Sequence, residues 1–345
     1  GYHETQTLPE GMTPGRVTAL RRELYTVLTP YGETAARLKG KFYYDSNARG
    51  DFPCVGDFVL LEINESGVSQ IAKLLPRRSK FSRADFSGHA AGYVKTVLEQ
   101  VVAANFDTVF ILSSLNQDFR VNRIQRYLTQ ARQSGALPVV VLTKADLAAD
   151  VEGPVAEVLA VAPDVPVHAV SSVTGFGLGA LEQYLHPGQT AVFLGMSGVG
   201  KSSLLNGLMG REVMEVNAIR EDDSRGRHTT TTRTLFRLPS GALVIDTPGL
   251  REIQLWADGQ AVDSSFADIE AFAESCRFRD CSHDGEPGCA VRAAVEAGDL
   301  AAERLESWRK LRREVEFLER RGDPVAEAAA RAVWRTRARA IRAME

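Results

Sequence analysis

The sequence lacks long apolar runs and has few cysteines. Its apolar runs are short, such as residues 138–142, and none approaches the ~18–20 residues that a membrane-spanning helix needs. Four cysteines in 345 residues exclude a disulfide scaffold. The first fourteen residues are polar and lack the apolar segment of a signal peptide. We therefore expect a flexible leader over residues 1–14 and a cytoplasmic protein with no membrane partner.

The charge balance is close to neutral, and the chain is long. A net charge of −3 gives no sign of a nucleic-acid partner when it is read alone. A single core rarely grows past ~250–300 residues, so two or three domains are expected.

Residues 15–80 hold short strand candidates separated by turn residues. These candidates are residues 16–17, 24–28, 35–38, 41–44, 58–62 and 67–74. Five or six short strands in this length predict a small closed β-barrel of the OB type. A cationic run at residues 76–83 follows, and it is either a solvated linker or an extension of an RNA-binding face.

From about residue 95, apolar strands alternate with helical segments. The strand candidates are residues 107–112, 138–142, 165–170, 190–194, 234–238 and 243–245, with helices at 122–134, 155–161 and 178–185 between them. This alternation predicts a parallel sheet that is covered on both faces. Strand signals end near residue 257.

Residues 195–202 match the phosphate-loop pattern G-x-x-x-x-G-K-[ST], between a strand and a helix predicted at 202–208. The glycines let successive N–H groups point at phosphate oxygens, and the helix N-terminus adds positive charge. Lys201 is expected to neutralise the β- and γ-phosphates, and Ser202 to ligate Mg²⁺. The predicted nucleotide-binding residues here are Gly195, Met196, Ser197, Gly198, Val199, Gly200, Lys201, Ser202 and Ser203.

A second motif, Thr143-Lys144-Ala145-Asp146, follows a buried strand and resembles the Asn-Lys-x-Asp motif of GTPases. The Asp146 carboxylate can accept two hydrogen bonds from guanine, and adenine offers the wrong polarity there. The stem of Lys144 can lie over the base, and Thr143 replaces the usual asparagine. Ser171 and Ser172 resemble the Ser-Ala-Lys loop that meets guanine O6. The alternative for the tetrapeptide is a plain strand-to-helix turn. The rival function is that of a P-loop ATPase or kinase.

Two further segments are candidates for the γ-phosphate side of the site. Asp246 and Gly249 resemble the Asp-x-x-Gly element, in which the carboxylate holds Mg²⁺ through a water and the glycine N–H meets the γ-phosphate. Upstream, a polar loop at residues 217–233 contains four threonines at 229–232, and the residues leave open which of them faces Mg²⁺. No glutamine follows Gly249. His228 is the nearest candidate for orienting water, and the alternative is an exposed loop histidine.

Cys276, Cys281, His283 and Cys289 fall within fourteen residues. Three thiols and one imidazole suit a closed tetrahedral zinc site with a structural role, and the alternative is free cysteines. Apolar residues at helical spacing in 303–321 predict an amphipathic helix. Residues 331–342 contain five arginines and no acid, which indicates either a solvated helix face or an rRNA-binding arm.

The order of the motifs is permuted. In ordinary GTPases the phosphate loop comes first, whereas here Asp146 and Ser171 precede Gly195 and Asp246. Matching segments lie at residues 75–79, 99–105, 143–147, 195–203, 226–231 and 246–252, and at the Cys/His cluster. With these the chain resembles the ribosome small-subunit-dependent GTPase A family of circularly permuted GTPases.

This resemblance implies an α/β P-loop GTPase domain in circularly permuted order, an N-terminal all-β OB-type barrel and a C-terminal, mostly helical zinc-binding domain. We place these domains at residues 81–255, 15–80 and 256–345. The resemblance implies GTP hydrolysis, with Mg²⁺, in late maturation of the small ribosomal subunit, stimulated by that subunit. It implies His228 as the residue that positions water, Thr230 as the threonine facing Mg²⁺, and rRNA contacts through the barrel and the C-terminal domain. We expect a monomer with one structural zinc. The alternative is a GTP-dependent RNA-binding module whose hydrolysis is incidental.

Overall fold

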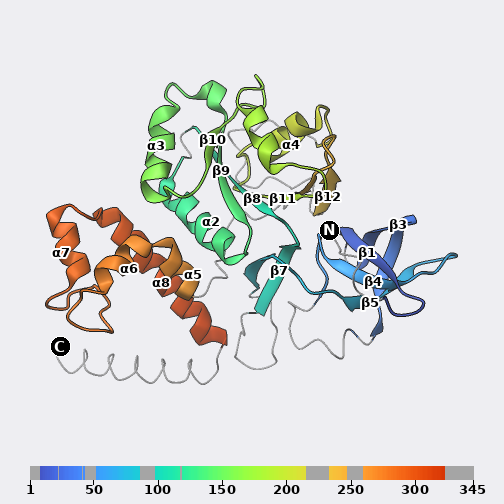
Figure 1. The fold of residues 1–345 in the computed structure, drawn as a ribbon, viewed down its shortest axis with the longest axis horizontal. Coiled ribbons are helices and arrows are strands. Elements are labelled where there is room, and N and C mark those ends of the chain that lie inside the picture. Colours follow the sequence, from blue (N-terminus) through green and yellow to red (C-terminus); the bar gives the residue numbers. More distant parts are fainter. Residues whose placement is uncertain are drawn as a thin grey trace, which may run out of the picture. The chain divides into compact units, whose positions relative to one another are not determined.

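The structure is a computed structural model. It describes residues 8–21, 23–40, 42, 52–85, 98–116, 119–214, 233–246 and 259–322 (Figure 1). The chain forms two compact units, residues 1–83 with 100–254, and residues 84–99 with 255–345. None of the described helices combines the length and apolarity needed to cross a membrane. The domain boundaries and the leader expected from the sequence stay predictions.

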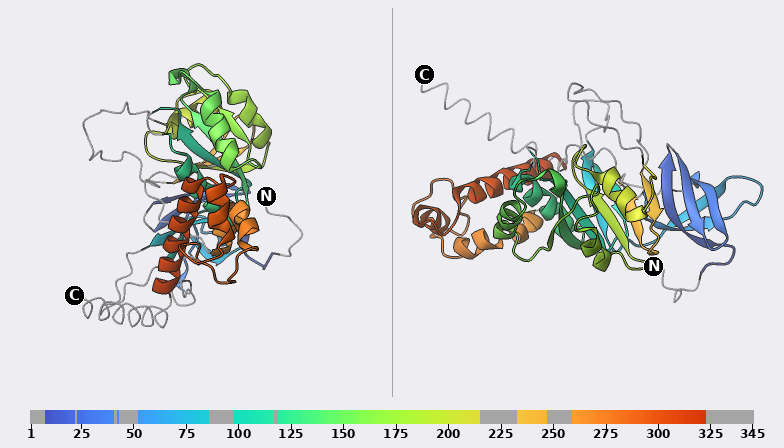
Figure 2. Two further views of the ribbon diagram at one scale, coloured as in Figure 1. Left: turned by 90° about the vertical axis from the view of Figure 1, so that its left-hand side faces the viewer. Right: turned by 90° about the horizontal axis from the view of Figure 1, so that it is seen from above.

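The first unit begins with a closed five-stranded barrel, drawn in blue in Figure 2. Its strands are β1 (Thr13–Arg21), β2 (Leu24–Thr29), β3 (Gly32–Leu38), β4 (Phe58–Glu62) and β5 (Ser69–Leu74). They pair in the order β1-β2-β3-β5-β4, and β4 returns to β1. Alternate side chains point inward, including Val17, Val27 and Ile71. The predicted barrel is confirmed, but the strand predicted at 41–44 is wrong at Phe42, which is helical.

The cationic run at 76–83 is not simply a solvated linker, because part of it is buried; its role as an extension of an RNA-binding face stays a prediction. Arg77 forms a bidentate ion pair with Asp57, at 2.8 Å (Nε–Oδ1) and 2.7 Å (Nη2–Oδ2). The Asp57 side chain is fully buried. Ser79 is also buried and bonds the backbone of Phe106. The run then enters β6 (Lys80–Asp85), which pairs with β7 (Leu98–Ala104) in a two-stranded sheet that the sequence reading missed.

The nucleotide-type sheet follows. Its strands are β8 (Thr108–Ser114), β9 (Leu137–Thr143), β10 (Val167–Ala169), β11 (Thr190–Leu194), β12 (Thr234–Arg237) and β13 (Leu243–Asp246). They lie in the order β10-β9-β8-β11-β13-β12, and all but β12 are parallel. The predicted parallel sheet is confirmed. The carboxyl ends of five strands therefore meet at one edge, where ligands bind in such folds.

Helices cover both faces of this sheet (Figure 1). On one face, α2 (Val121–Gln133) and α3 (Glu152–Val161) pack through residues such as Ile124, Leu128 and Val158. On the other, α4 (Lys201–Met209) packs through Leu204 and Leu205. The helix expected at 178–185 is a 3-10 helix, η3 (Leu178–Tyr184).

The second unit contains the ends of β6 and β7, and its secondary structure is helical in the described residues 259–322. It contains α5 (Gly259–Ser265), α6 (Ala267–Ala273), α7 (Ala290–Ala297) and α8 (Ala302–Gly322). Leu305, Trp308, Leu311 and Val315 form one buried stripe of α8, which confirms the predicted amphipathic helix. Their apolar partners include Phe266 on the α5–α6 side. The arginine run at 331–342 lies outside the described residues.

Candidate nucleotide site and metal cluster

The phosphate loop leaves the buried strand β11 and enters α4, as predicted. Gly195, Gly198 and Gly200 have positive φ angles of 155°, 76° and 99°, which L-residues with side chains rarely adopt. A Cβ on Gly195 would also lie 2.7 Å from the Leu112 carbonyl oxygen of the neighbouring strand β8. Glycine is therefore required where the loop turns away from the sheet.

Lys201 lies across the loop that it follows. Its Nζ donates to the carbonyl oxygens of Gly195 and Met196, at 2.6 Å each. The ammonium is thereby held over the phosphate loop. Ser202 and Ser203 follow in the first turn of α4, and both are half-buried.

The base-reading residues stand at the ends of the next two strands. Thr143 ends β9, Lys144 has a left-handed backbone (φ 61°), and Asp146 is exposed in the short 3-10 helix η2 (Ala145–Leu147). Ala145 N–H donates to the Val170 carbonyl at 3.1 Å, so the loops after β9 and β10 are joined. The buried hydroxyl of Ser171 orders the second loop by accepting from Val173 and Thr174 N–H, and Ser172 is half-buried.

Thr143 connects the two halves of the site. Its hydroxyl donates to the Val199 carbonyl of the phosphate loop at 2.5 Å, and its side chain is buried. The threonine that replaces the usual asparagine thus holds the base-reading loop against the phosphate loop. The sequence shows the replacement but not this contact, because the two residues are 56 positions apart.

Removing this hydroxyl tests its effect on binding. We expect Thr143→Val to weaken GDP binding about 5- to 10-fold, because a buried hydrogen bond contributes roughly 1 kcal/mol. Thr143→Ser keeps the hydroxyl and is expected to bind as the wild type does. Titration with a fluorescent GDP analogue measures both. Equal affinities for the valine variant and the wild type would contradict the assignment.

Asp246 ends β13 and is buried, with 6% of its surface exposed. Its neighbour Ile245 pairs with Val192 of the parallel strand β11. Asp246 therefore lies at the same edge of the sheet as the phosphate loop, which follows β11. His228, Thr230 and Gly249, together with the other threonines at 229–232, lie outside the described residues.

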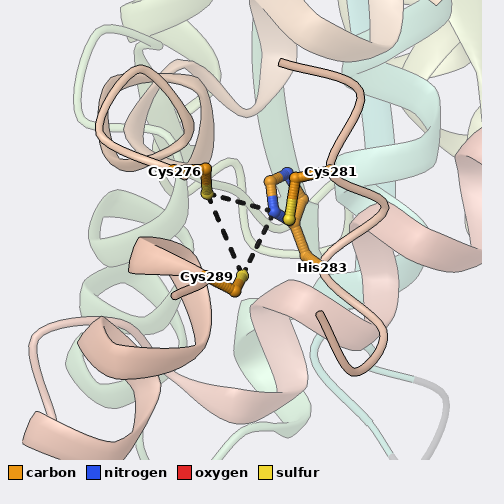
Figure 3. A group of neighbouring side chains, drawn as sticks. All are labelled: Cys276, Cys281, His283 and Cys289. Carbon is orange, nitrogen blue, oxygen red and sulfur yellow. Dashed lines mark hydrogen bonds between the residues drawn. The ribbon is translucent and has the colours of Figure 1, made fainter. Parts of the chain in front are cut away.

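The Cys/His cluster is assembled in the second unit (Figure 3). His283 Nδ1 lies 3.4 Å from Cys289 Sγ and 3.7 Å from Cys276 Sγ, and the two sulfurs are 4.0 Å apart. With Cys281, all four ligand atoms lie within 4.8 Å of one another. Tetrahedral zinc, with bonds of ~2.0–2.3 Å, places its ligand atoms roughly 3.5–3.8 Å apart. The donor set and its spacing fit such an ion.

The surroundings orient these ligands. Ala290 N–H donates to Cys276 Sγ at 3.3 Å and Arg292 N–H to Cys289 Sγ at 3.4 Å, which suits thiolates. Burial lowers the pKa of His283, which favours the neutral imidazole that a metal requires. The Glu286 carboxylate accepts hydrogen bonds from the Ser282 hydroxyl and from three backbone N–H groups around His283, so its pKa lies well below its usual range. The sequence reading did not identify Glu286.

Fold and site together define a circularly permuted P-loop nucleotide-binding protein, with base-reading loops that precede the phosphate loop and a separate Cys₃His cluster. The family model described as RsgA GTPase matches residues 74–256. The chain belongs to the RsgA GTPase family.

Curated relatives and solved structures agree with this placement. The small ribosomal subunit biogenesis GTPase RsgA 2 of Lactiplantibacillus plantarum is 46% identical over 90% of this chain and 86% of the relative. The protein of the same name from Listeria monocytogenes is 43% identical over 99% and 94%. The crystal structure of YjeQ from Thermotoga maritima has a TM-score of 0.63 and 28% identity over 88% of this chain and 98% of that one. YloQ, described as a circularly permuted GTPase, has a TM-score of 0.55 over 92% and 98%; at 22% identity it shows the fold alone.

Proposed function

We propose that the chain binds GTP and GDP at the carboxyl edge of the β8–β13 sheet and hydrolyses GTP. The contact between Thr143 and Val199 carries this proposal, because it joins a guanine-type loop to a phosphate loop in one site. Thr143, Lys144, Asp146, Ser171 and Ser172 surround the base in this proposal. The residues of 195–203 surround the phosphates, and Gly249 N–H meets the γ-phosphate.

In hydrolysis, a water oxygen attacks the γ-phosphorus while the bond to the β–γ bridging oxygen breaks, releasing GDP and phosphate. Lys201 neutralises charge that develops on the phosphates. His228 orients the attacking water. Ser202, Thr230 and Asp246 would hold Mg²⁺, directly or through water, and the ion would neutralise phosphate charge when bound. Zinc is the metal that Cys276, Cys281, His283 and Cys289 would hold.

The relatives are named for the biogenesis of the small ribosomal subunit. We propose that this chain acts in late maturation of that subunit as a cytoplasmic monomer, and that the subunit stimulates its turnover. The barrel (residues 15–80) and the C-terminal domain (256–345) would contact rRNA, and residues 81–255 would form the GTPase domain.

Exchanging the carboxylate at the base site tests guanine recognition. We expect Asp146→Asn to lower GTP affinity about 10- to 200-fold, since hydrogen bonds to charged groups contribute roughly 1.5–3 kcal/mol. Xanthine nucleotides carry a carbonyl in place of the exocyclic amine, so the amide should bind them better than the wild type does. Competition with GTP, XTP and ATP measures this. Equal losses for GTP and XTP would remove Asp146 from the base site, and equal ATP and GTP affinity in the wild type would favour a P-loop ATPase.

The direct test of the function is GTP turnover with and without purified small subunits, over a range of salt concentrations. Stimulation that weakens with salt is expected, because contacts to phosphates release counterions. Turnover that is unaffected by subunits, with binding retained, would favour a GTP-dependent RNA-binding module.

A further inference from the structure

The barrel and the nucleotide-type sheet share one continuous set of strands. Along one edge of β1, Thr13–Arg16 pair with β4, and Ala19 pairs with Thr234 of β12. Between these, Val17 exchanges backbone hydrogen bonds with the barrel loop, from Val17 N–H to Asp57 O at 2.8 Å and from Gly56 N–H to Val17 O at 2.9 Å. The register shift between Val17 and Ala19 lets β1 leave one sheet and join the other.

The barrel loop at residues 54–57 is seated directly on the strand that carries Asp246. Gly56 has a φ of 94°, and a Cβ there would lie 2.1 Å from the Ala104 carbonyl oxygen and 2.9 Å from Cδ1 of Ile245. Ile245 precedes Asp246 in β13. Ala104 N–H also donates to the Val55 carbonyl at 3.1 Å. The backbone of the loop at Gly56 therefore lies against the Ile245 side chain of this strand.

Arg16 and Asn105 fasten the loop in place. Arg16 donates from Nε to the Gly56 carbonyl at 3.2 Å and from Nη2 to the Asn105 carbonyl at 2.8 Å, and Asn105 Nδ2 donates to the same Gly56 oxygen at 3.2 Å. Burial, opposed by Asp107, lowers the pKa of Arg16 to about 10, so the guanidinium stays charged at neutral pH. From the barrel side, the buried Asp57–Arg77 pair holds the loop. Removing either partner would leave a buried charge unpaired, which is strongly destabilising, so the pair fixes the position of the loop.

The two strands on the γ-phosphate side of the site both meet the barrel, β13 at the barrel loop and β12 at Ala19 of β1. Asp246 follows Ile245, and β12 begins directly after the segment that contains His228 and Thr230. We propose that the barrel is part of the nucleotide switch, with Arg16 as the positioning residue that holds the barrel loop in place against Ile245 of β13. Exchange of GDP for GTP then changes the conformation of the barrel. By reciprocity, a ligand held on the barrel changes the affinity for nucleotide, typically by about 5- to 150-fold in such couplings.

The inference rests on the proposed function for the identity of the nucleotides. Its test is amide hydrogen exchange on the full chain, loaded with Mg²⁺ and either GDP or a non-hydrolysable GTP analogue. In the wild type, peptides covering residues 13–21 and 52–62 are expected to exchange at rates that differ at least about five-fold between the two nucleotides. In Arg16→Met this difference is lost, while the peptide over residues 190–205 still responds to nucleotide. Arg37→Met, at an exposed position on β3 of the same barrel, is the matched control and keeps the difference.

The possible results distinguish a barrel that is not coupled to the nucleotide from a chain that does not bind these nucleotides. Barrel peptides that exchange identically in both wild-type complexes, while residues 190–205 respond, would overturn the inference, and this outcome does not depend on any variant folding. A difference that persists in Arg16→Met would remove Arg16 from the coupling. No response at 190–205 to either nucleotide would instead defeat the proposed function.

Discussion

Lys201→Ala is expected to lower kcat/KM for GTP about 10²- to 10³-fold, which corresponds to the roughly 2.7–4 kcal/mol lost when one preorganised donor to a developing charge is removed. The ammonium already lies over the loop, bonded to Gly195 and Met196, so it does not need to be ordered when phosphate arrives. Most of the loss should appear in kcat, because charge on the phosphate oxygens grows toward the transition state. Steady-state and single-turnover kinetics measure how the loss divides between kcat and KM.

A matched control shows whether the loss of activity is specific to Lys201 or follows from removing any lysine. Lys73→Ala removes an exposed lysine of the barrel strand β5 and is expected to leave basal turnover unchanged. Lys201→Arg keeps the charge without the compact ammonium, so it should recover only part of the activity. Basal turnover of Lys201→Ala within three-fold of the wild type, with an unchanged melting temperature, would exclude Lys201 from the reaction.

The parts of the site that the sequence predicts are local ones. Each motif begins where an apolar strand ends. The spacing of apolar residues and the turn residues therefore predict that the phosphate loop, the base-reading loops and Asp246 lie at one edge of the sheet. The Cys/His cluster is similarly local, since its four ligands lie within one short segment. The same reasoning predicts the closed barrel, whose alternating strands have turns between them.

The parts that the sequence does not predict are the contacts between distant segments. Asp57 and Arg77 are 20 residues apart, and Arg16 and Asn105 are 89 residues apart. No pattern marks such partners in one sequence, because only the folded topology brings them together. Arg77 looks like part of a solvated charge run until its burial beside Asp57 is known. The β6–β7 pair is missed because β6 begins inside that run, where charge hides the strand signal.

The second large effect is expected at the metal cluster. Structural zinc contributes about 10–16 kcal/mol of apparent binding free energy, which is as large as the whole net stability of a typical domain, about 5–15 kcal/mol. The apolar core around Val262, Ile269 and Trp308 is small, so it should not hold the second unit together alone. We therefore expect that removing zinc with a chelator unfolds residues 259–322, while the phosphate-loop unit stays folded and still binds GDP.

Cys289→Ser makes this test specific. Cys289 is buried, it is the N-cap of α7, and its sulfur lies 3.4 Å from His283 Nδ1. Its loss should therefore remove both a metal ligand and the anchor of that helix. Cys54→Ala is the matched control, because Cys54 is a buried cysteine of the first unit and lies outside the cluster. The Cys54→Ala protein should retain one zinc per chain. Zinc content and limited proteolysis give the readout. A Cys289→Ser protein without zinc whose second unit resists protease as the wild type does would show that the apolar core alone holds these helices, and the metal would then have to serve a purpose other than folding.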